Sequence, residues 1–229
     1  MTDKIISLTF DDGWKSAIQE AEPLLLRYGM PATFYIISDR VPDKHTEYMN
    51  VSDLRTLVTH GHEIGVHTRS HKYLTELTNG EVWYEITEGL NDLLAFGFKP
   101  RTFAYPYGEW NPYIVKQVRE AGFFAARSIE RGVNDENVNH LLLRAFAVRE
   151  EHSLEEVVLW ISEFLRNESK WLILYFHQIE KAEVLRERKW IYGTTPVIFE
   201  GILAFLKKEG VAVVTLENGM ERLLKTTVG

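Results

Sequence analysis

The chain has 229 residues, of which 45% are hydrophobic and 26% are charged, and its formal net charge is −7. This composition is typical of a globular protein, and the length fits one domain, since α/β barrels run to ~200–250 residues undivided. The negative net charge argues against nucleic acid or an anionic membrane surface as the main partner. The sequence contains no cysteine, which excludes disulfides, thiolate metal ligands and cysteine nucleophiles.

No stretch of the sequence approaches the ~18 consecutive apolar residues of a membrane span, so we expect no such span. The first residues do not show a basic segment followed by an apolar stretch and a small-residue cleavage site. We therefore expect a cytoplasmic protein, or an extracytoplasmic one if a leader that preceded this sequence has been removed. The sequence does not indicate an oligomeric state.

Strand and helix patterns alternate along the chain. Short runs rich in β-branched and aromatic residues predict strands at 4–10, 32–37, 62–67, 102–105, 123–128, 146–148, 171–177 and 211–215. Apolar residues at helical spacing predict helices at 14–28, 50–60, 79–97, 112–121, 153–165, 196–208 and 218–224. Pro23 should interrupt or kink the first helix. The polar stretch 130–140 and the charged stretch 180–189 are predicted to be loops.

This alternation implies a mainly parallel sheet with helices outside it. About seven or eight βα units in one domain favour a closed barrel over an open sheet. We therefore predict an α/β fold of the TIM-barrel type for residues 1–229, as a single domain. In such barrels the functional side chains gather at the C-terminal ends of the strands.

The first predicted strand ends in two adjacent carboxylates and a glycine, Asp11-Asp12-Gly13. Because side chains alternate along a strand, the two carboxylates leave its end in different directions. One can then hold a metal ion while the other faces the reacting group. Asp-Asp-Gly is also ordinary turn chemistry, so the pair alone does not decide between a turn and a site.

Three histidines lie at other predicted strand ends. His67 ends the third strand, and His71 follows four residues later. Two imidazoles and one carboxylate, for which Asp12 is the nearest candidate, suit catalytic zinc or a similar divalent ion. The alternative is that these two histidines only cap a loop. His177 ends the most apolar strand, where a histidine buried among aromatic rings is the alternative, and its place on the same rim favours a functional role.

Taken in order, these blocks resemble the polysaccharide deacetylase family, also called the NodB-homology domain or carbohydrate esterase family four. Thr9-Phe10-Asp11-Asp12-Gly13 matches the first family motif, and Gly61 to His71 matches the second. Pro106-Tyr107-Gly108 matches the core of the third motif. Tyr175-Phe176-His177 takes the place of the last one, which usually begins with leucine. The resemblance covers essentially the whole chain and implies a distorted (β/α)7 barrel.

The resemblance implies a metal-dependent hydrolase of linear amides that removes N-acetyl groups, or O-acetyl groups, from acetylated sugars or polysaccharides. The implied cofactor is a divalent metal ion, zinc before cobalt, nickel, manganese or iron. Its implied ligands are Asp12, His67 and His71. The other implied roles are those of general base (Asp11), general acid (His177), backbone oxyanion donor (Tyr107) and substrate contact (Tyr105, Pro106 and Tyr107).

Two further features depart from the family pattern, besides Tyr175 in place of the usual leucine. The arginine that usually stands two residues before the proline of the third motif is replaced by Ala104, which leaves Asp11 without its usual partner. Arg127, at the next strand end, is the predicted substitute and Arg144 the second choice. The alternative for Arg127 is a plain surface salt bridge. The fourth motif, an acidic pair with tryptophan, is not recognisable in residues 128–139, and substrate choice is what these differences leave most open.

Other functions stay open. A non-heme iron oxygenase also uses two histidines and one carboxylate, although the βα alternation is unlike the all-β fold of most such enzymes. A relative that opens cyclic imides or ureides would need similar carbonyl polarisation. A catalytically silent carbohydrate-binding protein would need neither an acid nor a base. Four aromatic residues could stack on sugars near the rim or belong to the core, and these are Trp14, Trp110, Tyr113 and Trp190.

Overall fold

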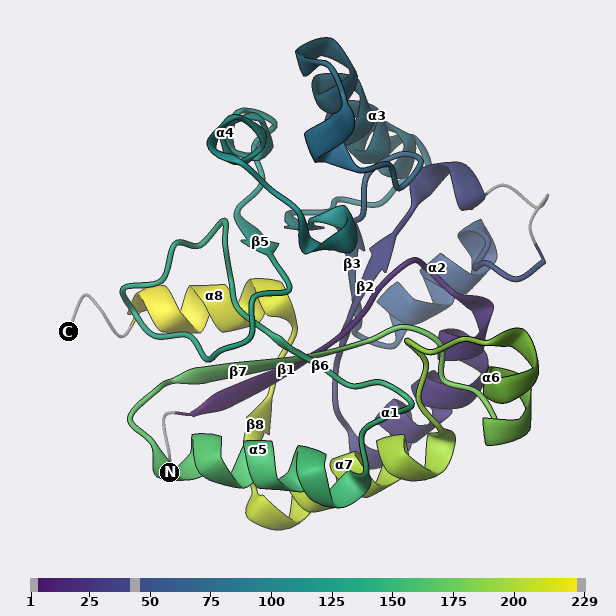
Figure 1. Ribbon diagram of the computed structural model, residues 1–229, viewed down its shortest axis with the longest axis vertical. Helices are drawn as coiled ribbons and strands as arrows, with labels where there is room; N and C mark the ends of the chain where they lie inside the picture. Colours follow the sequence, from purple (N-terminus) through teal and green to yellow (C-terminus); the bar gives the residue numbers. More distant parts are fainter. Residues whose placement is uncertain (1–3, 42–45, 226–229) are drawn as a thin grey trace.

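A curled sheet of parallel strands forms the centre of the computed structural model, which describes residues 4–41 and 46–225 (Figure 1). The strands are β1 (Ile5–Phe10), β2 (Thr33–Ile36), β3 (Glu63–Val66), β4 (Thr102–Ala104), β5 (Ala125–Arg127), β6 (Phe146–Ala147), β7 (Trp171–Phe176) and β8 (Ala212–Val213). Their order is β5-β4-β3-β2-β1-β7-β6, and β8 pairs with β1. The predicted distorted (β/α)7 barrel is confirmed as a curled sheet, but the expected closure is not complete, because the end strands β5 and β6 do not pair with each other.

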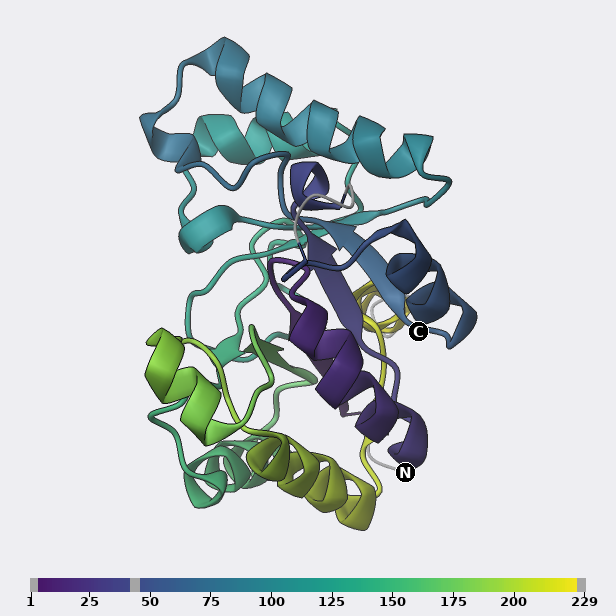
Figure 2. The ribbon, with the colours of Figure 1, turned by 90° about the vertical axis from the view of Figure 1, so that its right-hand side faces the viewer.

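Helices pack outside this sheet. They are α1 (Glu22–Tyr28), α2 (Val51–Thr59), α3 (Asn79–Ala95), α4 (Pro112–Glu120), α5 (Leu154–Arg166), α6 (Ala182–Arg188), α7 (Pro196–Glu209) and α8 (Leu216–Lys225). Figures 1 and 2 show α3 beside α4 at one end of the molecule, while α7 packs against both α1 and α5 at the other. Among the described residues, no helix is both long enough and apolar enough to cross a membrane.

Short helical turns lie between the larger helices and strands. The turns are η1 (Ala17–Ala21), η2 (Ser38–Arg40), η3 (Leu74–Glu76) and η4 (Pro106–Gly108). The π-helical turn η1 precedes α1, whose first turn contains Pro23, so the first predicted helix is interrupted as expected.

Two helix predictions differ from the structure. The prediction of a loop at the charged stretch 180–189 is wrong, because this stretch contains α6: strong helix formers there surround one fully buried residue, Leu185. The last helix begins at Leu216, two residues before its predicted start.

Strand β1 lies inside the sheet and pairs with three other strands, β2, β7 and β8. All six of its residues are buried, and it pairs with β7 along its whole length. At its C-terminal end the Phe10 ring stacks on Phe34 of β2 at 4.8 Å and on Phe176 of β7 at 5.3 Å. β1 and β7 thus end in register, and β2, which pairs with β1 through Phe34, continues for two more residues. The residues that follow β1 and β7 are therefore placed next to one another.

The turn after β3 packs closely against α3. The Arg69 amide donates a hydrogen bond to the Glu85 carbonyl, and the Glu85 carboxylate accepts hydrogen bonds from the amide and hydroxyl of Ser70. A Cβ atom added at Gly89 would lie 2.7 Å from the carbonyl carbon of Thr68. Only glycine lets the helix and the turn approach this closely, because the nearest atoms belong to rigid backbone.

We expect Gly89→Ala to lower the free energy of unfolding by about 1–3 kcal/mol, since the added methyl group forces α3 away from the turn. The matched control is Gly80→Ala on the same helix, where a Cβ would meet nothing within 4 Å. Urea denaturation of both variants measures the difference. Equal stability of the two variants would show that the close approach is not required.

Candidate metal and catalytic site

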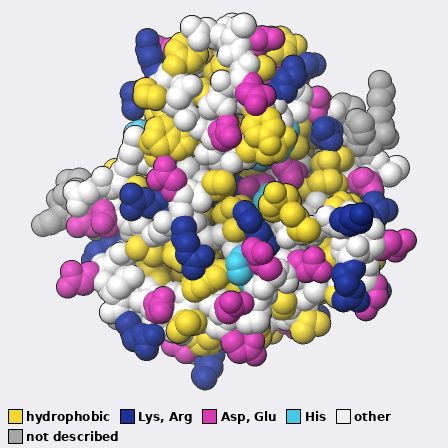
Figure 3. All heavy atoms as spheres, viewed as in Figure 1, with side chains coloured by type: hydrophobic (Ala, Val, Ile, Leu, Met, Phe, Trp, Pro, Cys, Tyr) yellow, Lys and Arg dark blue, Asp and Glu magenta, His cyan; other side chains and the backbone are white. Residues whose placement is uncertain are grey.

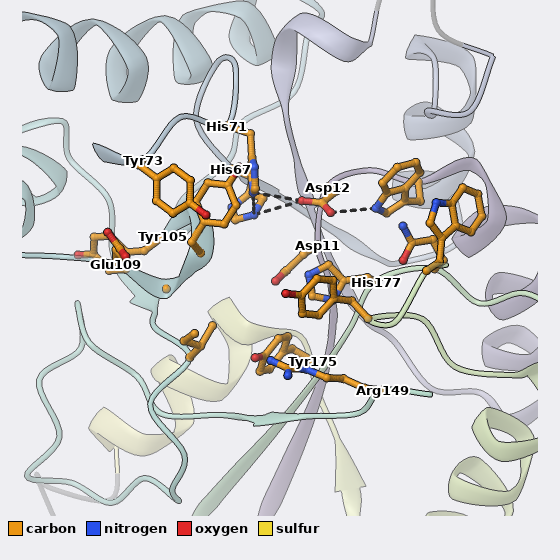
Figure 4. A pocket seen from close by; sticks show the side chains of 17 residues that line it. Asp11, Asp12, His67, His71, Tyr73, Tyr105, Glu109, Arg149, Tyr175 and His177 are labelled. Atoms are coloured by element: carbon orange, nitrogen blue, oxygen red, sulfur yellow. Dashed lines mark hydrogen bonds and ion pairs between the residues drawn. The ribbon is translucent and has the colours of Figure 1, made fainter. Parts of the chain in front are cut away.

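The carboxyl ends of the strands surround one cavity of about 570 Å³. Phe10 of β1 pairs with Phe176 of β7, so the residues that follow them, Asp11 and His177, leave neighbouring strands at the same level. The Asp11 amide donates a hydrogen bond to the Phe176 carbonyl at 2.9 Å. Seven of the predicted site residues line the cavity, namely Asp11, Asp12, His67, His71, Tyr105, Tyr107 and His177 (Figure 4). On the face seen in Figure 3, acidic and basic side chains are interspersed rather than segregated.

Asp12, His67 and His71 form a compact cluster whose ligand atoms all lie within 4.8 Å of one another. The Nε2 atoms of the two histidines are 3.2 Å apart. Asp12 Oδ1 lies 3.5 Å from His67 Nε2 and 3.3 Å from His71 Nε2. Oδ1 is buried and, apart from the two imidazoles, has no partner among the described residues. One carboxylate and two imidazoles that converge in this way fit a divalent metal ion.

Neighbouring groups orient the cluster for metal binding. His67 Nδ1 contacts the Ala104 carbonyl at 2.8 Å and must donate to it, which leaves the Nε2 lone pair directed at the cluster. Asp12 Oδ2 accepts a hydrogen bond from Trp14 Nε1 at 2.9 Å. Burial, followed by the charge of His67, lowers the pKa of His71 to about 4. His71 is therefore neutral near neutral pH, as a metal ligand must be.

The backbone at the cavity is strained. Five non-glycine residues in the described part of the chain have a positive φ, and four of them lie here: Asp12 (71°), Thr68 (61°), His71 (61°) and Tyr107 (57°). Such conformations cost of order 1–3 kcal/mol each and persist where the surrounding structure imposes them. Their concentration around one cavity supports a functional role for it.

Arg127 donates to both carboxylate oxygens of Asp11 through Nη2, at 2.5 and 2.6 Å. Both residues are buried, with 0% of Arg127 and 4% of Asp11 exposed. Arg127 also donates to the Ser128 carbonyl, and its Cζ lies 4.6 Å from the centre of the Tyr175 ring. Arg127 is therefore the partner of Asp11, as predicted from the alanine at position 104. The two residues form an interior ion pair and not a surface salt bridge. Arg144 is exposed instead and lies 3.9 Å from Glu130.

His177 lies between two tyrosine rings. Its ring centre is 5.9 Å from that of Tyr175 and 5.5 Å from that of Tyr192. Its Nδ1 atom is buried and has no hydrogen-bond partner among the described residues. Burial lowers the pKa of His177, although the carboxylates of Asp12 and Asp11 oppose the shift.

The third motif supplies an aromatic wall. The Tyr107 ring stacks on Tyr73 at 3.7 Å and lies 4.5 Å from the His71 ring. Tyr105 lines the cavity and donates from its hydroxyl to the Leu141 carbonyl. Pro106 is buried and does not line the cavity.

The four candidate stacking residues divide into two pairs. Trp14 and Trp190 line the cavity, with ring centres 5.3 Å apart. Trp110 and Tyr113 pack against the hydrophobic core instead. Sequence reasoning missed Arg149, which lines the cavity two residues beyond the end of β6. The available signal was its place on the rim of strand ends, but a strand of two residues is too short to stand out by periodicity.

Comparison with known proteins agrees with this geometry. The sequence profile described as "Polysaccharide deacetylase" matches residues 1–126. The chain belongs to the polysaccharide deacetylase family. The peptidoglycan-N-acetylglucosamine deacetylase of Bacillus cereus is 31% identical over 122 residues, which cover 53% of this chain and 54% of that protein. Chitin deacetylase 2 of Cryptococcus neoformans is 35% identical over 103 residues, which cover 44% of this chain and 21% of that protein. The chain thus matches about half or less of the length of these relatives.

Solved structures share the fold of this polysaccharide deacetylase family member. A family 4 acetyl xylan esterase from Clostridium thermocellum, in complex with cobalt, is 21% identical with a TM-score of 0.67, over 95% of this chain and 91% of that one. A family 4 carbohydrate esterase from Streptomyces lividans, in complex with acetate, is 20% identical with a TM-score of 0.66, over 96% and 97%. The likeness therefore extends beyond residue 126, where the sequence match ends.

We expect Arg127→Met to lower the free energy of unfolding by about 3–5 kcal/mol, because it leaves the buried Asp11 carboxylate without a counter-charge. The double variant Asp11→Asn/Arg127→Met should recover part of that loss, since it removes both charges. Urea denaturation measures both effects. A loss below about 1 kcal/mol, the usual size for an exposed pair, would contradict the buried ion pair.

Proposed function

We propose that this protein is a metal-dependent deacetylase that hydrolyses the N-acetyl groups, and by the same chemistry O-acetyl groups, of acetylated sugars or polysaccharides. The observation that carries the proposal is the Asp12–His67–His71 cluster beside a second carboxylate, Asp11, that is held separately by Arg127. The names of the relatives, which concern peptidoglycan and chitin, support acetylated glycans as the substrate class.

Zinc is our first choice for the divalent ion, with cobalt, nickel, manganese and iron as alternatives, since two imidazoles and one carboxylate accept all of these. When bound at Asp12, His67 and His71, such an ion would polarise a carbonyl group and acidify water. Each residue of the cluster would supply one ligand atom, and three protein ligands are the number typical of catalytic sites that also bind water or substrate.

We assign the two proton transfers to Asp11 and His177. Asp11 takes the proton of the attacking water, and Arg127 fixes the direction of its oxygens by binding both of them. His177 then protonates the leaving nitrogen, which departs poorly as an anion. Because burial lowers the pKa of His177, its protonated form is a stronger acid than an exposed imidazolium.

We assign the backbone N–H of Tyr107 to the oxyanion that forms when water adds to the carbonyl. The left-handed conformation of Tyr107, with φ of 57°, turns its peptide group within the short turn η4 at the cavity. A well-placed backbone donor contributes roughly 3–4 kcal/mol to such a step. The rings of Tyr107 and Tyr73 offer a flat wall for a sugar.

The other hypotheses account for less of the site. The parallel α/β sheet does not match the all-β fold expected of most oxygenases with two histidines and a carboxylate. A protein that only binds carbohydrate has no need of a buried ion pair at Asp11 beside a metal cluster. No observed contact favours a cyclic imide over an acetamide.

We expect acetate release from N-acetylated oligosaccharides to stop after chelation and to return when zinc or cobalt is added. His177→Ala should lower kcat about 10²- to 10⁴-fold through the loss of the acid, and the control His140→Ala, a change outside the cavity, should leave kcat unchanged. Acetate is measured on a panel of N- and O-acetylated sugars. Release that survives chelation, or that His177→Ala leaves intact, would contradict the proposed function.

A further inference from the structure

Arg149 lies in the wall of the cavity and has no part in the chemistry proposed above. It follows β6, on the same rim of strand ends as the catalytic candidates. In the view of Figure 4, Arg149 lies on the opposite side of Asp11 and His177 from His67 and His71. A cation in a substrate cavity calls for a partner of opposite charge.

The guanidinium of Arg149 has no such partner within the described part of the chain. Its Nε atom is buried and makes no hydrogen bond there, and the side chain makes no ion pair with a described residue. Its Cζ lies 5.0 Å from the centre of the Tyr192 ring, which covers one face of the group. The ring leaves the edge of the guanidinium, where its N–H donors lie, without an acceptor.

The acidic side chains of the cavity are engaged elsewhere. Asp11 is bound by Arg127, and Asp12 by Trp14 and the two metal-site histidines. Glu109 accepts a hydrogen bond from the Thr75 hydroxyl. A partly buried charge without a counter-charge is unfavourable, so an anion that enters the cavity would be bound strongly.

We propose that Arg149 binds an anionic group, a carboxylate or a phosphate ester, on the acetylated substrate. The planar fork of a guanidinium matches both groups through two parallel hydrogen bonds. His177 and Arg149 contact the same Tyr192 ring, which places the anion on the side of the proposed leaving group. The inference rests on the proposed deacetylase function and makes acidic acetylated sugars its preferred substrates over neutral ones.

The test uses one N-acetylated sugar in three forms, which carry a carboxylate, a phosphate ester or a neutral carboxamide at the same position. Wild-type protein should show kcat/KM about 10- to 100-fold higher for an anionic form than for the carboxamide. Arg149→Gln should bring that ratio close to one, mainly through KM, and Arg149→Lys should keep part of it. Arg144→Gln, at an exposed arginine that does not line the cavity, should keep the full ratio.

The outcomes separate this inference from the proposed function. Acetate release that does not distinguish charged from neutral sugars, or a preference that Arg149→Gln leaves intact, overturns the role of Arg149 and leaves the deacetylase standing. If no form releases acetate, equilibrium binding of the same three sugars, followed by the fluorescence of Trp14 and Trp190, decides. Tighter binding of an anionic form that depends on Arg149 supports the inference without the deacetylase, and equal binding overturns it.

Discussion

The ion pair between Arg127 and Asp11 is the interaction on which the rest of the site depends. It joins the end of β5 to the end of β1, across a sheet whose order places these strands four positions apart. Both charges are buried, so removing either one leaves the other without a counter-charge and destabilises the protein. The pair engages both oxygens of Asp11, which is not a member of the metal cluster although the adjacent residue, Asp12, is.

Most of the fold could be predicted because alternating strand and helix patterns leave few arrangements for a parallel sheet. The metal cluster was predictable for a related reason. Asp12 follows one strand and His67 follows another, and the ends of parallel strands meet at one rim. Ala104, in place of the usual arginine, predicted Arg127 as the partner of Asp11, and the pairing of Ala104 with Arg127 across β4 and β5 explains why an arginine at one position can replace an arginine at the other.

The remaining features depend on tertiary contacts that leave no local pattern. The positive φ angles of Thr68 and Tyr107 fall on residue types that rarely adopt such conformations, so no local pattern in the sequence marks them. Helix α6 was hidden because its single buried anchor, Leu185, gives no apolar periodicity. Arg149 follows a strand of two residues, and its missing counter-charge can be recognised only once the partners of the surrounding acids are known.

The central claim is that two adjacent carboxylates have separate tasks, and one comparison tests it directly. Zinc binding, measured by calorimetry, and acetate release are measured together for Asp11→Asn and Asp12→Asn. We predict that Asp12→Asn loses both, whereas Asp11→Asn still binds zinc but releases acetate at least ~10²-fold more slowly. Loss of zinc binding in both variants, or full acetate release by Asp11→Asn, would contradict the division of roles.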